Sequence, residues 1–355
     1  MKDKKKKTKR EKSKTARKNA TSMKKNLFST SLLEKYAQDH GKKNQEMYVI
    51  VDIDDANVLC EIGIRYYDGN DVDQDYVKAK KFFEKAAEQG HAEAQFMLGN
   101  MYYQGYGVPQ NYVKAIAYYE KAAEQGLVEA HHNLAGMYYE GKGVPQSYTK
   151  AIECFEKAAE QGFAPAQYIL AGIYNEGNGV PQDYAKAKEF YEKAAEQGLV
   201  EAQVNLGKAY IMGNGVPQDY AKAKKCFEKA AEEGIPAAYF NLGNMYYRGD
   251  GVRQDYTKAK EFFEKAVEQG HTEAQFMLGN MYYKGYGVEK NLAKAKEWYE
   301  KAAAKEFSAA QYMLGNLYSQ GDGVEKNLAK AKEWYEKAAK KGHVAALFNL
   351  LEYLK

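Results

Sequence analysis

The chain has 355 residues, 45% of them hydrophobic and 28% charged, with a net charge of +4. This apolar content is ample for an extensive core. No run approaches the 18 or more apolar residues typical of a membrane-spanning helix, and no apolar run near the N-terminus resembles the core of a signal peptide. Composition therefore argues against a membrane-embedded or secreted protein.

The first segment, residues 1–25, is strongly basic. It holds 13 Lys or Arg residues against Asp3 and Glu11, a net charge of +11, which leaves −7 for the rest of the chain. With so little apolar content, this tail is predicted to be disordered. Its KKKKTKR run is typical of a nuclear address, a nonspecific nucleic-acid contact or a contact with acidic lipid, and a solubilising leader is the other interpretation. We expect a cytoplasmic protein, or a nuclear one if the tail is recognised in a eukaryotic cell.

Residues 26–54 are predicted to form an N-terminal capping segment. Ser31 and Glu34 match a capping box that opens a short helix, Leu32 to His40. The apolar stretch from Met47 to Ile53 is suited to docking on the structure that follows, either as a strand or as a helix.

Residues 55–342 repeat with a period of 36, giving eight units. We number the positions of each unit from 1 to 36, so that His91 is position 1 and Gly126 is position 36 of the second unit. A glycine closes every unit except the seventh, where Glu306 stands and where we expect a local weak point. A fixed period of this length is the signature of a solenoid whose units pack on their neighbours. Residues 343–355 are predicted to be a C-terminal capping helix, in which Leu351 takes the place of the small residue found at position 9.

Each unit is predicted to form two antiparallel helices. In the second unit, apolar residues recur at helical spacing from Ala92 to Gln104, which we call helix A. Glycines and a Val-Pro-Gln turn follow, and Asn111 is placed to cap helix B, which we expect to run from Tyr112 to about Gln125. The equivalent caps are Asp75, Ser147, Asp183, Asp219, Asp255, Asn291 and Asn327.

Two further positions are constant in character. Position 9 is always Gly or Ala, which lets a neighbouring helix approach closely. A lysine stands in the first turn of every helix B, where the helix dipole disfavours a cation, so we expect its stem to lie on a tyrosine with its ammonium in water. A basic ridge that follows phosphates is the alternative.

The repeated unit resembles the Sel-one-like repeat, a relative of the tetratricopeptide repeat. The pattern is most complete in the segments from Ala92 to Gly126 and from Ala164 to Gly198. The resemblance covers Asp55 to Lys355. It implies an all-α fold, a right-handed α-solenoid of about eight helix pairs, that serves as a non-enzymatic adaptor or scaffold for protein binding. Some members of this repeat class are described as β-lactam-binding or hydrolysing, but those look secreted and rich in paired cysteines, unlike this chain.

One face of helix A is the candidate binding surface. Positions 6, 10 and 13 lie opposite the apolar stripe, and in tetratricopeptide-like folds they line the concave groove. An asparagine offers both donors and acceptors to an extended peptide, and aromatic rings add apolar contact. In the alternative interpretation the rings pack against the next helix A and the asparagines are only solvated. The predicted groove residues are Phe96, Asn100, Tyr103, His132, Tyr139, Tyr168, Lys208, Phe240, Asn244, Tyr247, Phe276, Asn280, Tyr283, Tyr312 and Asn316.

The sequence offers no recognisable catalytic, cofactor or metal site. The histidines at position 1 are two or more units apart, and no Cys/His cluster has the spacing of zinc ligands. Cys154 and Cys226 share one phase two units apart and Cys60 has no partner in phase, so free thiols are expected. The predicted partner is a protein or extended peptide. The alternative is an adaptor tethered to nucleic acid or acidic membrane by residues 1–25, and the oligomeric state is left open.

Overall fold

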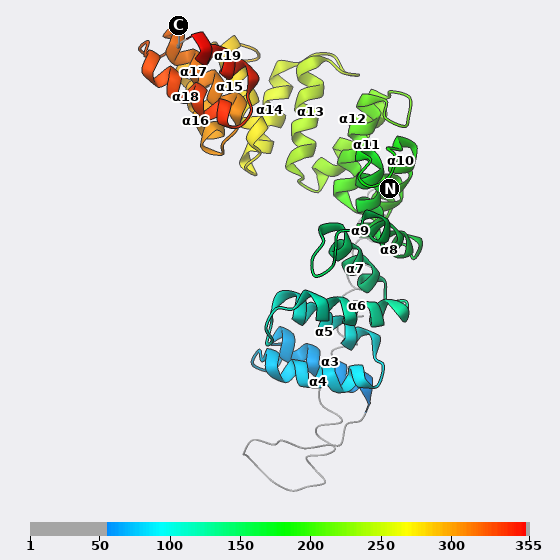
Figure 1. Ribbon diagram of the computed structural model, residues 1–355. Coiled ribbons are helices and arrows are strands. Elements are labelled where there is room, and N and C mark those ends of the chain that lie inside the picture. The colour runs from blue at the N-terminus through cyan, green and yellow to red at the C-terminus, as the bar shows by residue number, and fades with distance from the viewer. Residues whose placement is uncertain (1–54, 353–355) are drawn as a thin grey trace. The chain divides into compact units, whose positions relative to one another are not determined.

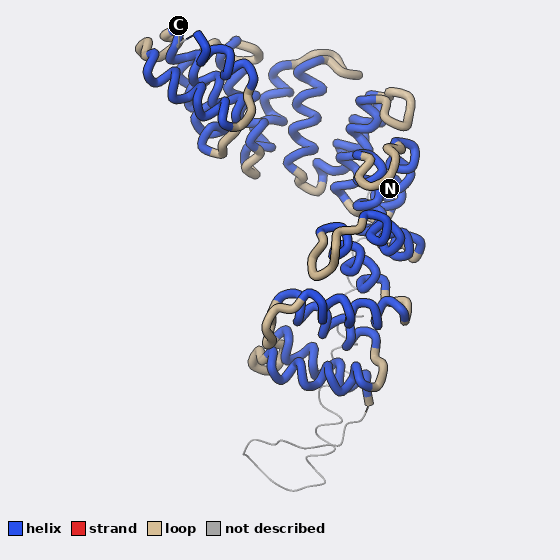
Figure 2. Tube along the Cα trace, viewed as in Figure 1, coloured by secondary structure: helices blue, strands red, loops and turns tan. Residues whose placement is uncertain are grey.

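The computed structural model describes residues 55–352, and within this range the chain forms helices joined by short loops (Figure 2). The predictions for the basic tail, for the helix from Leu32 to His40 and for the stretch from Met47 to Ile53 lie outside these residues. None of the helices in 55–352 is both long and apolar enough to span a membrane.

Every unit contributes one helix A and one helix B, each of 13 residues, and the chain ends in a shorter helix, α19 (Val344–Glu352). Each helix packs chiefly on the helices that precede and follow it in sequence (Figure 1). This is the predicted α-solenoid. The helices A are α3 (Ala56–Asp68), α5 (Ala92–Gln104), α7 (Val128–Glu140), α9 (Ala164–Glu176), α11 (Val200–Met212), α13 (Pro236–Arg248), α15 (Thr272–Lys284) and α17 (Ser308–Gln320). The helices B are α4 (Tyr76–Glu88), α6 (Tyr112–Glu124), α8 (Tyr148–Glu160), α10 (Tyr184–Glu196), α12 (Tyr220–Glu232), α14 (Tyr256–Glu268), α16 (Leu292–Ala304) and α18 (Leu328–Lys340).

Local chemistry fixes the helix ends. Asn111 accepts a hydrogen bond from the amide of Lys114, and all seven equivalent residues cap their own helix B in the same way. Helix A ends at a left-handed glycine such as Gly105, at φ 82°. The predicted bounds of α5 are confirmed, and α6 ends one residue earlier than expected.

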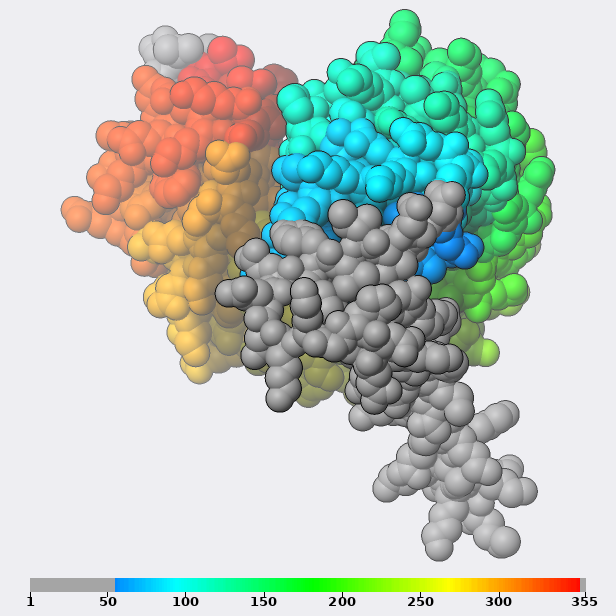
Figure 3. Space-filling model, turned by 90° about the horizontal axis from the view of Figure 1, so that it is seen from below, coloured from blue at the N-terminus to red at the C-terminus, as the bar shows by residue number. Residues whose placement is uncertain are grey.

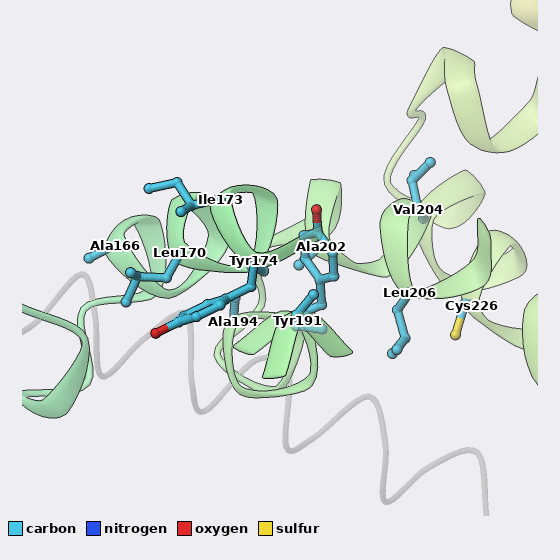
Figure 4. Packing of buried hydrophobic residues seen from close by; sticks show 14 of the residues in the cluster. Ala166, Leu170, Ile173, Tyr174, Tyr191, Ala194, Ala202, Val204, Leu206 and Cys226 are labelled. Atoms are coloured by element: carbon cyan, nitrogen blue, oxygen red, sulfur yellow. The ribbon is translucent and has the colours of Figure 1, made fainter. Parts of the chain in front are cut away.

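The two helices of a unit meet at position 9. A Cβ added to Gly99 or Gly279 would lie 2.5–2.6 Å from the ring of Tyr119 or Tyr299, respectively. These rings are fully buried, as are Phe83, Phe227 and Phe263 at the same place in other units. The small residue therefore admits a large ring from helix B, which confirms the expected close approach. On the face seen in Figure 3, the cyan residues that include α4 adjoin those of the following helix pair without a visible gap. Figure 4 shows part of the buried cluster that runs through the central units.

The repeated lysine of helix B lies on a tyrosine, as predicted, but its ammonium group, rather than its stem, lies over the ring. In all eight units its Nζ sits 4.9–5.4 Å from the ring centroid of the tyrosine at position 12 of helix A. A cation over a ring face is attracted by the ring's quadrupole, which offsets the unfavourable helix dipole. The lysines therefore contribute to the contact between the two helices of a unit.

Glu306 adopts the left-handed backbone conformation, at φ 60°. Such a conformation costs a non-glycine residue on the order of 1 kcal/mol. Glu306 forms an exposed ion pair with Lys341 Nζ at 2.7 Å, and exposed pairs contribute little. We expect Glu306→Gly to raise the thermal midpoint, measured by circular dichroism. Glu273→Gly, which places glycine in the first turn of α15, is expected to lower it. An unchanged midpoint for Glu306→Gly would show that position 306 is unstrained.

Candidate functional site

The predicted groove residues lie on helices A, half-buried in every case except Lys208, which is exposed. Neighbouring units bring some of them together. Asn100, Tyr103 and His132 line one cavity of about 320 Å³ between α5 and α7, and Tyr312 and Asn316 line another of about 640 Å³ near the C-terminal end. Residues from distant units do not meet.

The rings at position 6 contact helix B of their own unit. Phe96 lies 5.8 Å from Tyr119, centroid to centroid, and the corresponding distances elsewhere are 5.5–5.9 Å. Some rings also touch position 1 of the next unit, as Tyr312 does by stacking on His343 at 4.5 Å. These rings thus join helix A, helix B and the following unit, and each keeps a partly exposed face.

Three of the four asparagines have a structural partner that the sequence did not indicate. Tyr119 Oη donates to Asn100 Oδ1 at 2.7 Å, and Tyr299 and Tyr335 do the same to Asn280 and Asn316 at 2.8 Å. In the unit of the fourth asparagine, Asn244, the place of this tyrosine is taken by Phe263, which has no hydroxyl, and no hydrogen bond of the Asn244 side chain is seen within residues 55–352. The asparagines at 100, 280 and 316 are therefore held by their oxygens, with the Nδ2 group in only a long contact, 3.8–3.9 Å, with a methionine sulfur.

The tyrosines at position 13 reach the loop of the next unit. Lys142 Nζ donates to Tyr103 Oη at 2.9 Å, Asn178 donates to Tyr139 at 3.3 Å, and Tyr283 donates to Asp322 at 2.9 Å. Tyr247 instead packs on Tyr286, with 6.1 Å between centroids. These contacts couple successive units along the candidate surface.

Glycine at position 10 leaves open space on this surface. An added Cβ at Gly136 or Gly172 would meet nothing within 4 Å, and Gly136 lines the 320 Å³ cavity together with Asn133 and Phe155. Asn133 Nδ2 donates to Asn100 Oδ1 at 3.2 Å across the junction of the two units. Neither Asn133 nor Gly136 was predicted from the sequence, although asparagine recurs at position 7 (Asn133, Asn205 and Asn241) and glycine at position 10 (Gly136 and Gly172).

A buried glutamine at position 5 also bridges neighbouring units. Gln167 Nε2 donates to Ala159 O of the preceding helix B at 3.1 Å, and its Oε1 accepts from Gln197 at 2.7 Å. In the third unit this place is taken by His131, whose Nδ1 is buried without a hydrogen-bond partner, as is Nδ1 of the adjacent His132. Both histidines lie on α7, and His132 lines the 320 Å³ cavity.

Burial lowers the pKa of His131, with a further contribution from Lys157, and burial alone lowers that of His132. Because the unfolded chain then binds protons more readily, the stability due to neutral histidines is complete above pH 6.5 and is lost as pH falls toward the lowered pKa values. We expect the fall in thermal midpoint from pH 7.5 to 5 to be smaller in His131→Gln/His132→Phe, which restores the Gln-Phe pair of the second unit. An equal fall in the wild-type chain and the variant would contradict this assignment.

One group of potential metal ligands lies together: Cys60, His91 and Glu93, with ligand atoms within 4.8 Å of one another. His91 is already engaged, since its Nδ1 accepts from the amide of Ala94 at 3.2 Å and its Nε2 lies 3.2 Å from Asn57 Oδ1. Burial, with the charge of Glu93, raises the pKa of the Cys60 thiol to about 12. The Cys60 thiol is neutral and His91 caps α5, so packing and helix capping account for the proximity of these three residues. His271 and His343 cap their helices in the same way.

All three cysteines have free thiols, and burial raises the pKa of each. Since the thiolate is the nucleophilic form, none of them is activated at neutral pH.

Comparison with known proteins matches the repeat to one family model, described as Sel1 repeat. The matches cover eight successive segments: 56–91, 92–127, 128–163, 164–199, 200–235, 236–271, 272–307 and 308–343. No curated protein matches the chain.

Two solved structures are similar over most of the chain. The first is c5321, a protective antigen of uropathogenic Escherichia coli strains with an SLR fold, at 39% identity and a TM-score of 0.74, covering 91% of this chain and 67% of that one. The second is a Sel1 repeat protein from Oxalobacter formigenes, at 32% identity and a TM-score of 0.70, covering 86% of this chain and 88% of that one.

Proposed function

The chain belongs to the Sel1 repeat family, and from this premise we propose that it is a non-enzymatic scaffold that binds an extended segment of a partner protein along the helix A surface. A helical repeat scaffold of this kind is suited to protein–protein interaction. The observation that carries the finer proposal is the row of asparagines fixed by buried tyrosines.

The tyrosine hydroxyls orient the asparagine amides. Because Oδ1 of Asn280 accepts from Tyr299, its Nδ2 group is left as the donor available to a ligand. Asn316 repeats this arrangement one unit later. One unit before Asn280, the side chain of Asn244 forms no hydrogen bond within the described part of the chain, so both of its amide atoms are offered to a ligand. Donors at matching positions in successive units suit the carbonyl oxygens of an extended main chain, which every peptide has.

The cavity at Gly136 supplies a second element of recognition. Its lining includes the apolar side chains of Phe155 and Ile169 and the polar side chains of Asn133 and Glu140. We infer that one side chain of the bound segment enters here, while the asparagines bind its backbone elsewhere along the array.

A peptide selection tests the proposal. Random 16-residue peptides displayed on phage would be selected on the full chain, and the dissociation constants of the recovered peptides measured on variants. Asn244→Ala/Asn280→Ala should weaken binding about tenfold, as expected for the loss of about 1.4 kcal/mol in two hydrogen bonds. Gly136→Leu, which fills the cavity, should weaken it further.

The matched control is Glu153→Ala/Glu189→Ala, which changes two exposed residues of helices B. Thermal midpoints would confirm that all variants are folded. Peptides that bind the groove variants as tightly as the wild-type chain, yet lose affinity for the helix B control, would overturn the proposal.

A further inference from the structure

Position 28, on helix B, carries an aromatic ring in most units but a cysteine in two. The cysteines are Cys154 and Cys226, and the rings are Phe82, Tyr118, Phe190, Phe262, Trp298 and Trp334. The exchange removes a large planar side chain from a place where the repeat otherwise provides one.

Where a phenylalanine or tyrosine is present, it stacks on the tyrosine at position 12 of helix A. Tyr66 and Phe82 lie 5.8 Å apart with a 7° interplanar angle. The pairs in three further units have centroid distances of 5.6–6.0 Å and angles of 7–13°. Near-parallel stacking is thus the rule at this place, and such pairs stabilise beyond the area they bury.

At Cys226 the stack is incomplete. Tyr210 keeps its place at position 12, and a cavity of about 240 Å³ lies beside it, where α10, α11 and α12 meet. Its lining includes Leu206 and Cys226, which lie next to each other in Figure 4. The volume is sufficient for a phenyl or indole ring.

The surroundings show that this cavity occupies the place of the missing ring. In the second unit, burial raises the pKa of Tyr118, and the charges of Tyr102, Glu84 and Glu88 act in the same direction, so both carboxylates lie near its ring. Their counterparts three units later are Glu192 and Glu196, and both line the cavity. A ring bound there would have the same neighbours as Tyr118.

The charges at the cavity favour an acidic neighbour for that ring. Glu192 is neutralised by Lys188, with 2.8 Å between Nζ and the carboxylate, and it accepts from Tyr210 Oη at 3.4 Å. Lys225 and Lys229 also line the cavity, and neither has a carboxylate partner among the contacts of residues 55–352. Glu196 is the one remaining negative charge of the described lining, so two unpaired positive charges stand against one negative charge. The uncompensated charge is therefore positive.

We propose that this cavity is a second protein-binding site, which takes an aromatic side chain of a partner next to an acidic residue and thereby completes the stack on Tyr210. It lies on residues distinct from those of the helix A surface. Its existence therefore does not depend on the function proposed above.

The test uses the full chain with methyl-labelled leucine and the dipeptide N-acetyl-Trp-Glu-amide as probe. Titration should shift the methyl signals of Leu206. Cys226→Phe, which restores the ring found at 82, 190 and 262, should abolish the shift, whereas Cys226→Ala should preserve it. Circular dichroism would establish that Cys226→Phe is folded, and Cys226→Leu serves as a smaller filling variant.

Charge and ring are tested separately. Lys225→Glu/Lys229→Glu should lower the affinity for N-acetyl-Trp-Glu-amide at least threefold and raise the affinity for N-acetyl-Trp-Lys-amide. N-acetyl-Ala-Glu-amide should not shift Leu206. Asn244→Ala/Asn280→Ala should leave the titration unchanged, which separates this site from the groove. Leu206 shifts that persist in both filled variants, or that the alanine peptide reproduces, would overturn the proposal.

Discussion

Replacing Gly279 by alanine is expected to destabilise the α15–α16 pair by about 1–3 kcal/mol, the usual cost of overpacking a filled core. The added Cβ would lie 2.6 Å from the ring of Tyr299, which is fully buried and has little room to move. Because a repeat array unfolds by parts, the loss should be read from amide hydrogen exchange in α15 and α16 as well as from the thermal midpoint.

Gly136→Ala is the matched counterpart. This glycine also lies within a helix A, but its Cβ would point into open space. Removing a helical glycine should then stabilise α7 by about 0.5–1 kcal/mol through backbone entropy. If Gly279→Ala and Gly136→Ala changed stability in the same direction, the conclusion that position 9 is tightly packed and position 10 of this unit is open would be wrong.

Tyr299→Ala is expected to have the largest effect, a loss of about 3–5 kcal/mol, since it leaves a cavity where a large buried ring stood. Tyr299→Phe keeps the ring and removes only the hydrogen bond to Asn280, so its cost should be about 0.5–1.5 kcal/mol. Chemical denaturation, followed with hydrogen exchange at α16, would measure both.

The sixth unit provides the natural comparison, because Phe263 and Asn244 already form the pair that Tyr299→Phe would create. Phe263→Tyr should therefore add a hydrogen bond to Asn244 and raise stability slightly. A loss for Tyr299→Phe as large as that for Tyr299→Ala would mean that the hydroxyl, rather than the ring, holds the unit together.

The helices and their ends could be predicted from the sequence because local chemistry determines them. Asn111 caps the helix it precedes and Gly105 ends the one it follows, and each acts through backbone groups within four residues. The small residue at position 9 and the lysine of helix B were also predicted, since Gly or Ala in the one case and Lys in the other recur in all eight units and so indicate packing that the units share.

The candidate site could be predicted only in part. Helical geometry placed positions 6, 10 and 13 on one face of helix A, but it gave no sign that Tyr119 would hold Asn100, because the two are 19 residues apart on different helices. The cavity at Gly136 was missed for a related reason, as its lining comes from five helices.

The period and the capping residues thus determined, by themselves, that this chain is a solenoid of paired helices, because they act within one turn or one unit. The tertiary structure decided which amide atoms the asparagines retain for a ligand and where a ring is missing. Both depend on side chains from helices that meet only after folding. The amide of Asn280 is oriented by the hydroxyl of Tyr299. The lack of an aromatic ring at Cys226 leaves a cavity only because α10, α11 and α12 surround that position.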